Sequence, residues 1–281
     1  MTALLLAIPI LFGATTDFSD EIAAQGFAIF GTDGVVNSYP SPASPMGLDY
    51  DAGLGLMWQA TEDGSGGVYT VDPATGSYTL RFNIPYYFSG ADLQSNGCHY
   101  DAVNNYLYLA DYNGDGGATA GDLITCFYLD DPDSPTLMDY WDLATTDGIL
   151  GITYKDPYFY VNFYGAGQLR EYTLSSGGSY TLNNSWSASY GGIWYYETWN
   201  VFFTHAALGT TAYVLDGDDP TNVLDTFSPG CSMGCAMGPD PMPEDYLWSS
   251  DFNTTTNNQI DNEYVPSALE ATTWGNLKSA F

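Results

Sequence analysis

The tetrapeptide Gly47-Leu48-Asp49-Tyr50 opens a pattern of glycine, apolar residue, variable residue and tyrosine that recurs along the chain. Further copies begin at Gly97, Gly151 and Gly192, and a degenerate copy reads Gly234-Cys235-Ala236-Met237. Successive copies start 50, 54, 41 and 42 residues apart. A period of roughly 40–50 residues, built from short strands, is the sequence signature of a β-propeller.

Each copy begins a similar series of short apolar segments. After Gly47 the segments 55–60, 68–71 and 77–82 are rich in Tyr, Val and Phe, and Gly, Pro, Asp and Ser separate them. Between Phe18 and Pro266 no apolar stripe repeats every 3.6 residues, so the pattern predicts an all-β core. We expect the glycine to let the innermost strand approach the axis, and the tyrosine to fill the wedge between blades.

The two ends of the chain predict how the ring closes. Residues 27–30 and 35–40 look like the outer two strands of a unit, and no inner strands precede them. The last unit has inner strands, beginning at Gly234 and at Tyr246, and a thin outer strand at 259–265. The N-terminal strands are therefore expected to complete the last blade, which makes five blades. Six is the alternative, if 27–40 and 266–281 form a degenerate sixth.

This organisation resembles the repeat propellers of secreted bacterial proteins, the NHL- and YVTN-like class. The resemblance covers about residues 26–265 and includes a turn of the "VDPxTG" type, Val71-Asp72-Pro73-Ala74-Thr75-Gly76. It implies the fold but no one function, because that class contains lyases, hydrolases, sensors and binding modules. The domains expected are an apolar segment at 1–16, the propeller at 17–265, and a tail at 266–281 with a short helix.

The charge of the chain excludes some partners. Thirty-four acidic residues against four basic ones give a formal net charge of −30. Such a surface repels phosphate backbones and anionic membranes, so a nucleic acid is not expected as a partner. It attracts cations, above all Ca²⁺. Abundant Ser, Thr, Asn and Tyr with almost no Lys suits a secreted, extracellular or cell-surface protein.

The N-terminal segment allows two interpretations. Its apolar run, Ala3 to Phe12, is too short to span a bilayer, and no transmembrane span is predicted. It fits the core of a secretory signal, although no Lys or Arg precedes it. A retained segment would instead bury itself against another copy, giving a homo-oligomer or polymer through residues 1–16.

The sharpest local motif runs from Asp111 to Asp122. Oxygen ligands at Asp111, Asn113, Asp115 and Asp122, with the carbonyl of Gly117 and a glycine at the sixth position, match a calcium loop of the EF-hand type. The loop resembles the dockerin form, which also ends in Asp. Here strands rather than helices are expected on both sides, which favours a structural Ca²⁺ site on a blade hairpin.

Four cysteines permit three pairings. In an oxidising compartment the pairings 98–126 and 231–235 are favoured. Cys98 and Cys126 lie on the first and third strands of one unit, and Cys231 and Cys235 lie four apart in a glycine-rich loop. With a strand between them, the backbones of the first pair would be about 10 Å apart, which is beyond comfortable reach unless the strand ends converge.

No residue is assigned a catalytic role. Gly230-Cys231-Ser232-Met233-Gly234 matches the nucleophile-elbow pattern, but no helix follows it. The two histidines, His99 and His205, lie on different units, and His205 is expected to cap a strand. Asn183 and Asn253 fit the glycosylation acceptor pattern. The cluster Trp194, Tyr195, Tyr196 and Trp199 is expected mainly to pack between blades, with sugar stacking as the alternative.

Together these features favour a non-enzymatic, extracellular, calcium-stabilised propeller that acts as a structural, surface-attachment or binding module and self-assembles if residues 1–16 are retained. The alternatives are a propeller enzyme, such as a lyase or glycosidase, and a lectin that binds glycans. An enzyme would need two carboxylates about 5–10 Å apart in a cleft.

Overall fold

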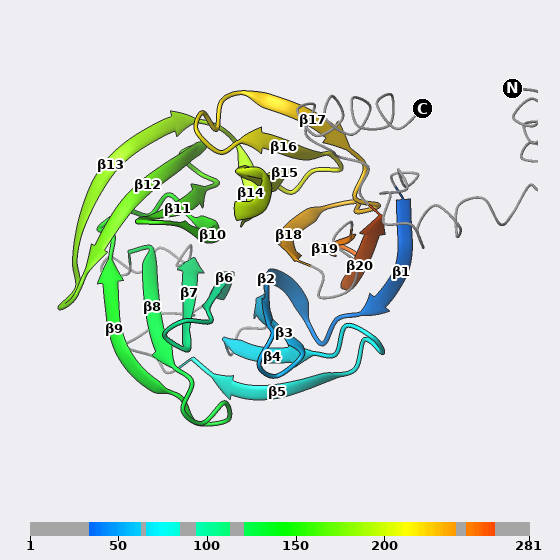
Figure 1. Cartoon of the computed structure of the whole chain (residues 1–281), viewed down its shortest axis with the longest axis horizontal. Coiled ribbons are helices and arrows are strands. Elements are labelled where there is room, and N and C mark those ends of the chain that lie inside the picture. The colour runs from blue at the N-terminus through cyan, green and yellow to red at the C-terminus, as the bar shows by residue number, and fades with distance from the viewer. Residues whose placement is uncertain (1–33, 63–65, 85–93, 113–120, 240–245, 262–281) are drawn as a thin grey trace, which may run out of the picture.

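The chain forms five antiparallel sheets of four strands, arranged as blades around one axis (Figure 1). The computed structural model describes residues 34–62, 66–84, 94–112, 121–239 and 246–261. Within each of the first four blades the strands follow one another from the axis outward. The predicted five-bladed all-β propeller is thus confirmed, and the six-bladed alternative is wrong.

Strands that belong to one blade are consecutive in the chain, except in the fifth. Blade 1 contains β2 (Ser44–Asp51), β3 (Leu56–Glu62), β4 (Gly67–Val71) and β5 (Tyr78–Asn83). Blade 2 contains β6 (Gln94–Asp101), β7 (Tyr106–Tyr112), β8 (Leu123–Tyr128) and β9 (Thr136–Asp142). Blade 3 contains β10 (Ile149–Lys155), β11 (Tyr158–Phe163), β12 (Gln168–Ser175) and β13 (Ser179–Ser187). Blade 4 contains β14 (Tyr190–Tyr196), β15 (Val201–Ala206), β16 (Ala212–Asp216) and β17 (Val223–Phe227), with a 3₁₀ turn at Glu197–Trp199.

The fifth blade joins the two ends of the described chain. It contains β18 (Gly234–Pro239), β19 (Tyr246–Asp251), β20 (Thr256–Asp261) and, outermost, β1 (Gly34–Pro40). Side chains reinforce the junction: Asn37 Nδ2 donates to Gln259 Oε1 at 2.6 Å, and Ser38 Oγ donates to Asn258 Oδ1 at 2.8 Å. The predicted closure is confirmed, with three strands from the C-terminal unit and β1 from the N-terminal side. The predicted strand at 27–30 and the tail at 266–281 lie outside the described residues.

Both edges of every blade carry a β-bulge. The outermost strands bulge at Val36, Arg81, Met138, Asn183 and Leu224. The innermost strands bulge close to the repeated step, at Met46, Asn96, Leu150, Cys235 and between Tyr190 and Ile193. A bulge bends its strand, increases the local twist and disrupts the ladder of unpaired groups. The bulged residues, which have no partner on the neighbouring strand, therefore bend the blades both at the rim and at the axis.

The repeated glycines lie where neighbouring inner strands come close. A Cβ on Gly47 would lie 2.5 Å from the backbone nitrogen of Cys98, and one on Gly97 would lie 2.9 Å from that of Ile152. A Cβ on Gly151 would lie 2.8 Å from the carbonyl oxygen of Gly191. Glycine is needed because the backbone of the next blade occupies the space.

The degenerate fifth copy is shifted by two residues from its predicted position. Gly47 pairs with Ala60 on the next strand, and the residue with the same place in blade 5 is Ala236, which pairs with Ser250. The fifth step therefore reads Ala236-Met237-Gly238-Pro239 rather than beginning at Gly234. The shift arises because Ala236 stands where the other blades have glycine, while Gly234, two residues earlier, matches the glycine of the pattern by chance.

Each pair of neighbouring blades encloses its own apolar cluster. Trp58 and Val68 of blade 1, for example, pack with Leu107 and Leu109 of blade 2. Separate clusters fill the other four interfaces. The tyrosine of the repeated step lies at the margin of these clusters, as predicted, for Tyr50, Tyr100, Tyr154 and Tyr195. In the described part of the chain, no helix has the length and apolar character that crossing a bilayer requires.

Candidate functional site

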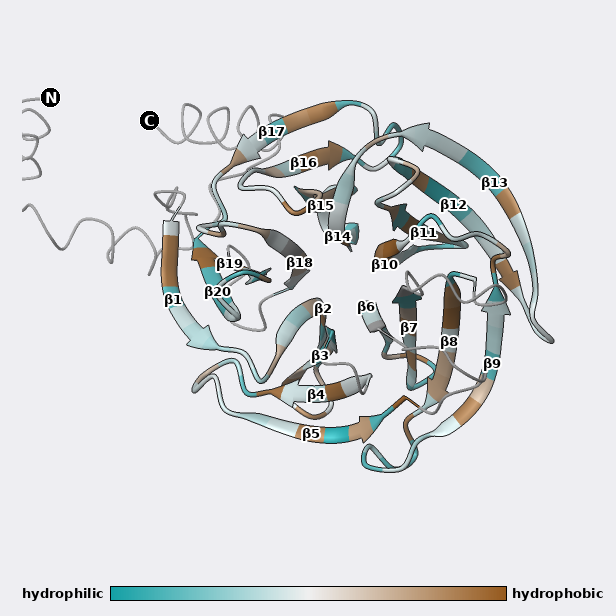
Figure 2. Ribbon diagram, turned by 180° about the vertical axis from the view of Figure 1, so that it is seen from behind, coloured by the Kyte–Doolittle hydropathy of each residue, from teal (hydrophilic) through white to brown (hydrophobic). Residues whose placement is uncertain are grey.

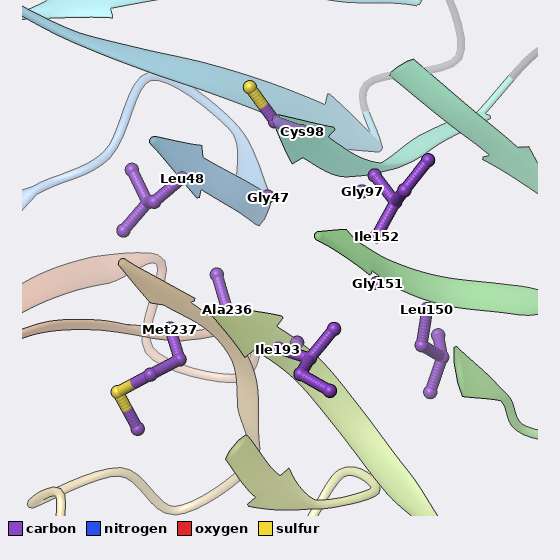
Figure 3. Close-up of a pocket in the computed structure, with 11 residues that line it drawn as sticks. Gly47, Leu48, Gly97, Cys98, Leu150, Gly151, Ile152, Ile193, Ala236 and Met237 are labelled. Atoms are coloured by element: carbon purple, nitrogen blue, oxygen red, sulfur yellow. The ribbon is translucent and has the colours of Figure 1, made fainter. Parts of the chain in front are cut away.

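The axis of the ring is narrow and apolar. The space there is about 150 Å³, with space open to solvent included, and residues of all five inner strands line it, among them Gly97 and Gly151 (Figure 3). The side chains of Leu48, Ile193 and Met237 belong to the clusters between blades, so mainly backbone and glycine border the axis. Pockets that bind small molecules are typically about 300–1,000 Å³ with a few convergent polar groups. Among the described residues, the axis therefore offers neither the volume nor the polar side chains of such a pocket.

At one end of the axis, the variable residue of the repeated step links neighbouring blades. Asp49 Oδ2 accepts a hydrogen bond from the backbone nitrogen of Tyr100 at 2.7 Å, and Thr153 Oγ1 accepts one from that of Tyr195 at 3.0 Å. His99 Nδ1 lies 2.9 Å from Asp49 Oδ2, a close contact without hydrogen-bond geometry. The carboxylate of Asp49 is thus engaged in holding blade 1 to blade 2.

The predicted calcium loop does lie on a blade hairpin, between β7 and β8. Asp111 is the last residue but one of β7 and pairs with Leu123 at the start of β8. Residues 113–120 lie outside the described part, and with them Asn113, Asp115 and Gly117. The ligand set predicted from the sequence can therefore be followed only at its two ends, Asp111 and Asp122.

Those two ends face opposite sides of blade 2. Asp111 continues the alternation of Leu107 and Leu109, which face blade 1. Asp122 continues that of Ile124 and Cys126, which face blade 3. Successive side chains on a strand alternate between faces, so the register separates the two carboxylates. The structure thus does not bring together the first and twelfth positions of the loop.

Asp122 has partners of its own. Both carboxylate oxygens lie 3.1 Å from the backbone nitrogen of Gly148, which donates to them. Its backbone is also bound, donating to Thr145 O at 2.6 Å and accepting from Leu143 N at 2.9 Å. Burial raises the pKa of Asp122 to about 6, while the backbone hydrogen bonds oppose that rise. Asp122 therefore anchors the connection between blades 2 and 3.

Asp111 has no such partners. It is fully buried, and neither carboxylate oxygen has a hydrogen-bond partner. Burial raises the pKa of Asp111 to about 8. A buried carboxylate without compensation costs several kcal/mol, about 3–5 when a partner has been removed. Burial therefore favours the protonated, neutral form of Asp111, and among the predicted ligands that can be followed it is the one without a partner.

The predicted disulfide between Cys98 and Cys126 does not fit the blade. Cys98 pairs with Leu109 on β7, and Cys126 pairs with the adjacent residue, Tyr108. Their side chains therefore face opposite sides of the sheet, and both cysteines are buried free thiols. Cys231 is also free, and its sulfur lies 3.0 Å from Ser249 Oγ. The predicted 231–235 disulfide is therefore not formed in this structure either.

His205 is buried between blades 4 and 5 rather than capping a strand. Its Nε2 lies 2.9 Å from Ala236 O and 2.7 Å from Ser249 Oγ, and its Nδ1 has no partner. Because a carbonyl can only accept, Nε2 carries the proton of the neutral ring. Burial lowers the pKa of His205 to about 4. A neutral, fully buried imidazole of this kind holds two blades together and is out of reach of a substrate.

The remaining sequence candidates lie in structural positions. Ser232 precedes strand β18 rather than a helix, and its hydroxyl donates to Asp251 Oδ2 at 3.0 Å. The predicted packing of the aromatic cluster is confirmed, with Trp194 stacked on Phe203 at 5.7 Å between ring centroids. Asn183 and Asn253 are exposed, on β13 and in the β19–β20 turn, and their glycosylation stays a prediction.

The three described cations all form ion pairs across blade boundaries. Arg81 of blade 1 pairs with Asp133 of blade 2 at 3.1 Å, and Lys155 of blade 3 pairs with Asp218 of blade 4 at 3.0 Å. Arg170 of blade 3 pairs at 2.6 Å with Asp147, in the connection from blade 2. In the described ranges, no group of three or more His, Cys, Asp or Glu side chains is arranged to hold a metal ion.

The comparisons with known proteins concern the fold. No protein-family profile and no curated protein sequence matches the chain. Among solved structures, glutaminyl cyclase from Myxococcus xanthus is similar with a TM-score of 0.59 at 10% identity, over 81% of this chain and 94% of that one. A PQQ-bound aldose sugar dehydrogenase from Streptomyces coelicolor is similar with a TM-score of 0.53 at 12% identity, over 82% and 98%. A chain of a nidogen/laminin complex is similar with a TM-score of 0.51 at 14% identity, over 77% and 75%. At these identities, likeness supports the propeller fold and no activity.

Proposed function

We propose that the protein is a non-enzymatic, extracellular propeller that serves as a calcium-stabilised structural or binding module. The narrow axis carries the proposal, because the space there is only about 150 Å³ even with space open to solvent included. The histidines add support: His205 is locked between blades, and the neighbour of His99, Asp49, already accepts backbone hydrogen bonds. Such residues stabilise the ring and do not converge on a reacting atom.

Calcium belongs to the proposal because of charge and because of Asp111. A chain with a net charge of −30 repels itself, and bound cations relieve that repulsion. Asp111 supplies a buried carboxylate without a partner beside the calcium-like sequence motif. In an extracellular location even weak binding of Ca²⁺ would suffice, since extracellular modules work at roughly 10⁻⁴–10⁻³ M.

Self-association is the part of the proposal that the rim supports. At the rim of blade 3 lies its outermost strand, β13 (Figure 2). It is nine residues long and contains no charged residue. The bulge at Asn183 interrupts this edge, so a second copy would pair with the segments on either side of it rather than across it. An uncharged edge strand is a template for a second chain. In so acidic a protein it is also a place where two copies meet without charge repulsion.

Sedimentation and electron microscopy of the full chain, in saline with calcium or with a chelator, test the proposal. We expect association in calcium that the substitution Leu182→Lys on β13 weakens, and that the control Leu80→Lys on β5 leaves unchanged. Monomers under every condition would refute self-association. Turnover of a glycan or of an amino-terminal peptide by the purified chain would instead favour the enzymatic alternative.

A further inference from the structure

The loops at one end of blades 3, 4 and 5 form a surface without charged residues. Three of them join the second strand of a blade to the third, and three lead to the next inner strand: 164–167, 207–211 and 252–255, with 188–189, 228–233 and 41–43. None of these residues is acidic, basic or a histidine. At the margin, Asp251 is 2% exposed, and its carboxylate accepts from the backbone nitrogens of Ser232 and Asn253. We call this surface the uncharged face.

Backbone hydrogen bonds hold these loops to one another. Each bond joins loops that follow one another around the ring: Ala188 N to Gly167 O at 2.9 Å, Ala207 N to Ser189 O at 3.0 Å, Gly234 N to Gly209 O at 2.8 Å, Phe252 N to Met233 O at 3.0 Å, and Ser41 N to Thr255 O at 2.8 Å. A surface whose loops are already ordered loses little conformational freedom when a partner binds. The uncharged face is therefore preorganised for contact.

The centre of the uncharged face is apolar, because it covers the axis of the ring. Leu208 and Phe252 are half-buried there and pack against buried aliphatic residues at the start of the inner strands. Leu208 has a φ of 50°, a left-handed conformation that glycine adopts more readily than an aliphatic residue. Tyr164 is 50% exposed, and exposed threonines such as Thr210 lie beside it. An apolar centre with an uncharged polar margin is the anatomy of a protein–protein interface.

The opposite ends of the blades are acidic. Their turns carry exposed acidic side chains, among them Asp130, Asp131, Asp156, Glu197 and Asp219. The terminal segments outside the described residues also continue from that side, since Gly34 and Asp261 pair at that end of blade 5. The described charge of the ring is thus concentrated away from the uncharged face.

This asymmetry selects the partner. Two copies with a net charge of −30 each repel one another wherever acidic surfaces meet. We propose that the uncharged face binds the same face of a second copy, around a twofold axis. A strand of seven residues, such as β14, is roughly 20 Å long, so the two acidic ends would stay about 40 Å apart. That distance is several times the Debye length of about 8 Å at physiological ionic strength, so the acidic ends would hardly repel each other.

The inference rests on the proposed assembly role but not on β13. The two surfaces lie on different parts of the ring, β13 at its rim and the uncharged face across the axis. A chain with two separate contact surfaces can associate beyond a dimer. Leu182→Lys, which weakens the rim contact, should therefore leave pairs of rings that are joined face to face.

The test is sedimentation of the full-length Leu182→Lys variant over a range of concentrations in saline with calcium, with electron microscopy of side views. We expect pairs of stacked rings. Adding Tyr164→Glu or Thr210→Glu should weaken the pair at least about tenfold, because the twofold axis places the new charge on both sides of the contact. Raising the KCl concentration should strengthen the pair, since salt screens the remaining repulsion.

Val103→Glu on the same background is the matched control. Val103 is 92% exposed in the hairpin between β6 and β7, at the acidic end of blade 2, so the same charge is added away from the contact. We expect it to leave the dissociation constant of the pair unchanged. Thermal unfolding of each variant checks that these exposed substitutions leave the ring folded.

Each outcome decides the matter. Stacked pairs that Tyr164→Glu and Thr210→Glu dissociate and Val103→Glu preserves would support the inference. Pairs that survive both of those substitutions, or a Leu182→Lys variant that is monomeric while the wild type associates, would overturn the inference and leave association through β13 standing. Monomers of the wild type under every condition would refute both.

Discussion

Mild acid should lower the free energy of unfolding, because it favours protonation of His205 at the junction between blades 4 and 5. The neutral ring donates from Nε2 to Ala236 O, and its Nδ1 is buried without a partner. Protonation would place a second N–H, with a positive charge, where nothing accepts it. The ring cannot move aside easily, because a Cβ on nearby Gly234 would already overlap it. The folded state therefore disfavours the protonated form.

The size of the effect follows from the shift in pKa. His205 titrates at about 4 when folded, against 6.5 for an unperturbed side chain. Because the folded pKa lies below the unfolded one, the stability linked to His205 is fully present above about pH 6.5 and is lost as the pH falls towards 4. The loss amounts to about 2 kcal/mol at about pH 5 and about 3 kcal/mol at about pH 4.

The assay is chemical denaturation at a series of pH values, with the wild type compared with His205→Gln. Glutamine keeps a donor for the Ala236 carbonyl but does not titrate. Carboxylates whose pKa is shifted contribute to the pH dependence of both proteins, and the difference between the two isolates His205. We expect the wild type to lose about 2 kcal/mol more than the variant between about pH 7.5 and about pH 5.

Parallel curves for the two proteins over that range would refute the reasoning. They would mean that the ring is hydrated or that Nδ1 finds an acceptor in the folded protein. Equal unfolding slopes with denaturant in both proteins are the control that compactness has not changed.

Three other predictions concern the ring itself. Gly97→Ala should lower the free energy of unfolding by about 1–3 kcal/mol, because the added methyl group overpacks the axis. In the control Gly53→Ala the Cβ would meet only a side-chain oxygen at 3.1 Å. This control should change the free energy of unfolding by less than about 0.5 kcal/mol. Deletion of residues 1–40 removes β1, and calorimetry should then show no cooperative unfolding transition. Deletion of residues 1–33 retains every described strand and should preserve that transition. Equal stability of the two truncated chains would contradict the closure of the ring by β1. Peptide mapping without reductant should find Cys98 and Cys126 unlinked, and a reductant-dependent peptide joining them would show that the register of blade 2 is wrong.

Much of the architecture was predictable because the repeated step marks a physical necessity. A Cβ at Gly47, Gly97 or Gly151 would overlap the next blade. Glycine therefore recurs at this position, although most other positions differ from one unit to the next. The strand that closes the ring was predictable from the sequence, since residues 35–40 match an outer strand and no inner-strand pattern precedes them. The fifth step was misplaced because Ala236 replaces the glycine and a chance glycine lies two residues earlier.

The faces of the strands were not predictable in the same way. Which side of a sheet a residue faces depends on whether it lies an even or an odd number of residues from a reference position on the strand. A bulge adds one residue to that count without leaving a recognisable pattern in the sequence. Ser95 and Cys98 share a face although they are three residues apart, because Asn96 is bulged. Asp111 and Asp122 are joined by a loop, so their relative faces follow only from the pairing of Asp111 with Leu123.

One signal could have pointed to the residues that were missed. Leu107, Leu109 and Asp111 continue one alternation on β7, and Leu123, Thr125 and Phe127 continue another on β8. A polar residue that interrupts an otherwise apolar face is unusual and marks a buried group that needs a partner or a neutral form. The register that places Ser95 opposite Asp111 came only from the structure.

The most direct measurement is a crystal structure of the full chain grown with calcium, with the ion located by anomalous scattering. A peak within about 2.3–2.6 Å of side-chain or carbonyl oxygens of the segment from Asp111 to Asp122 would support a calcium-stabilised propeller. The absence of a peak along that segment, at a calcium concentration that saturates weak sites, would contradict it.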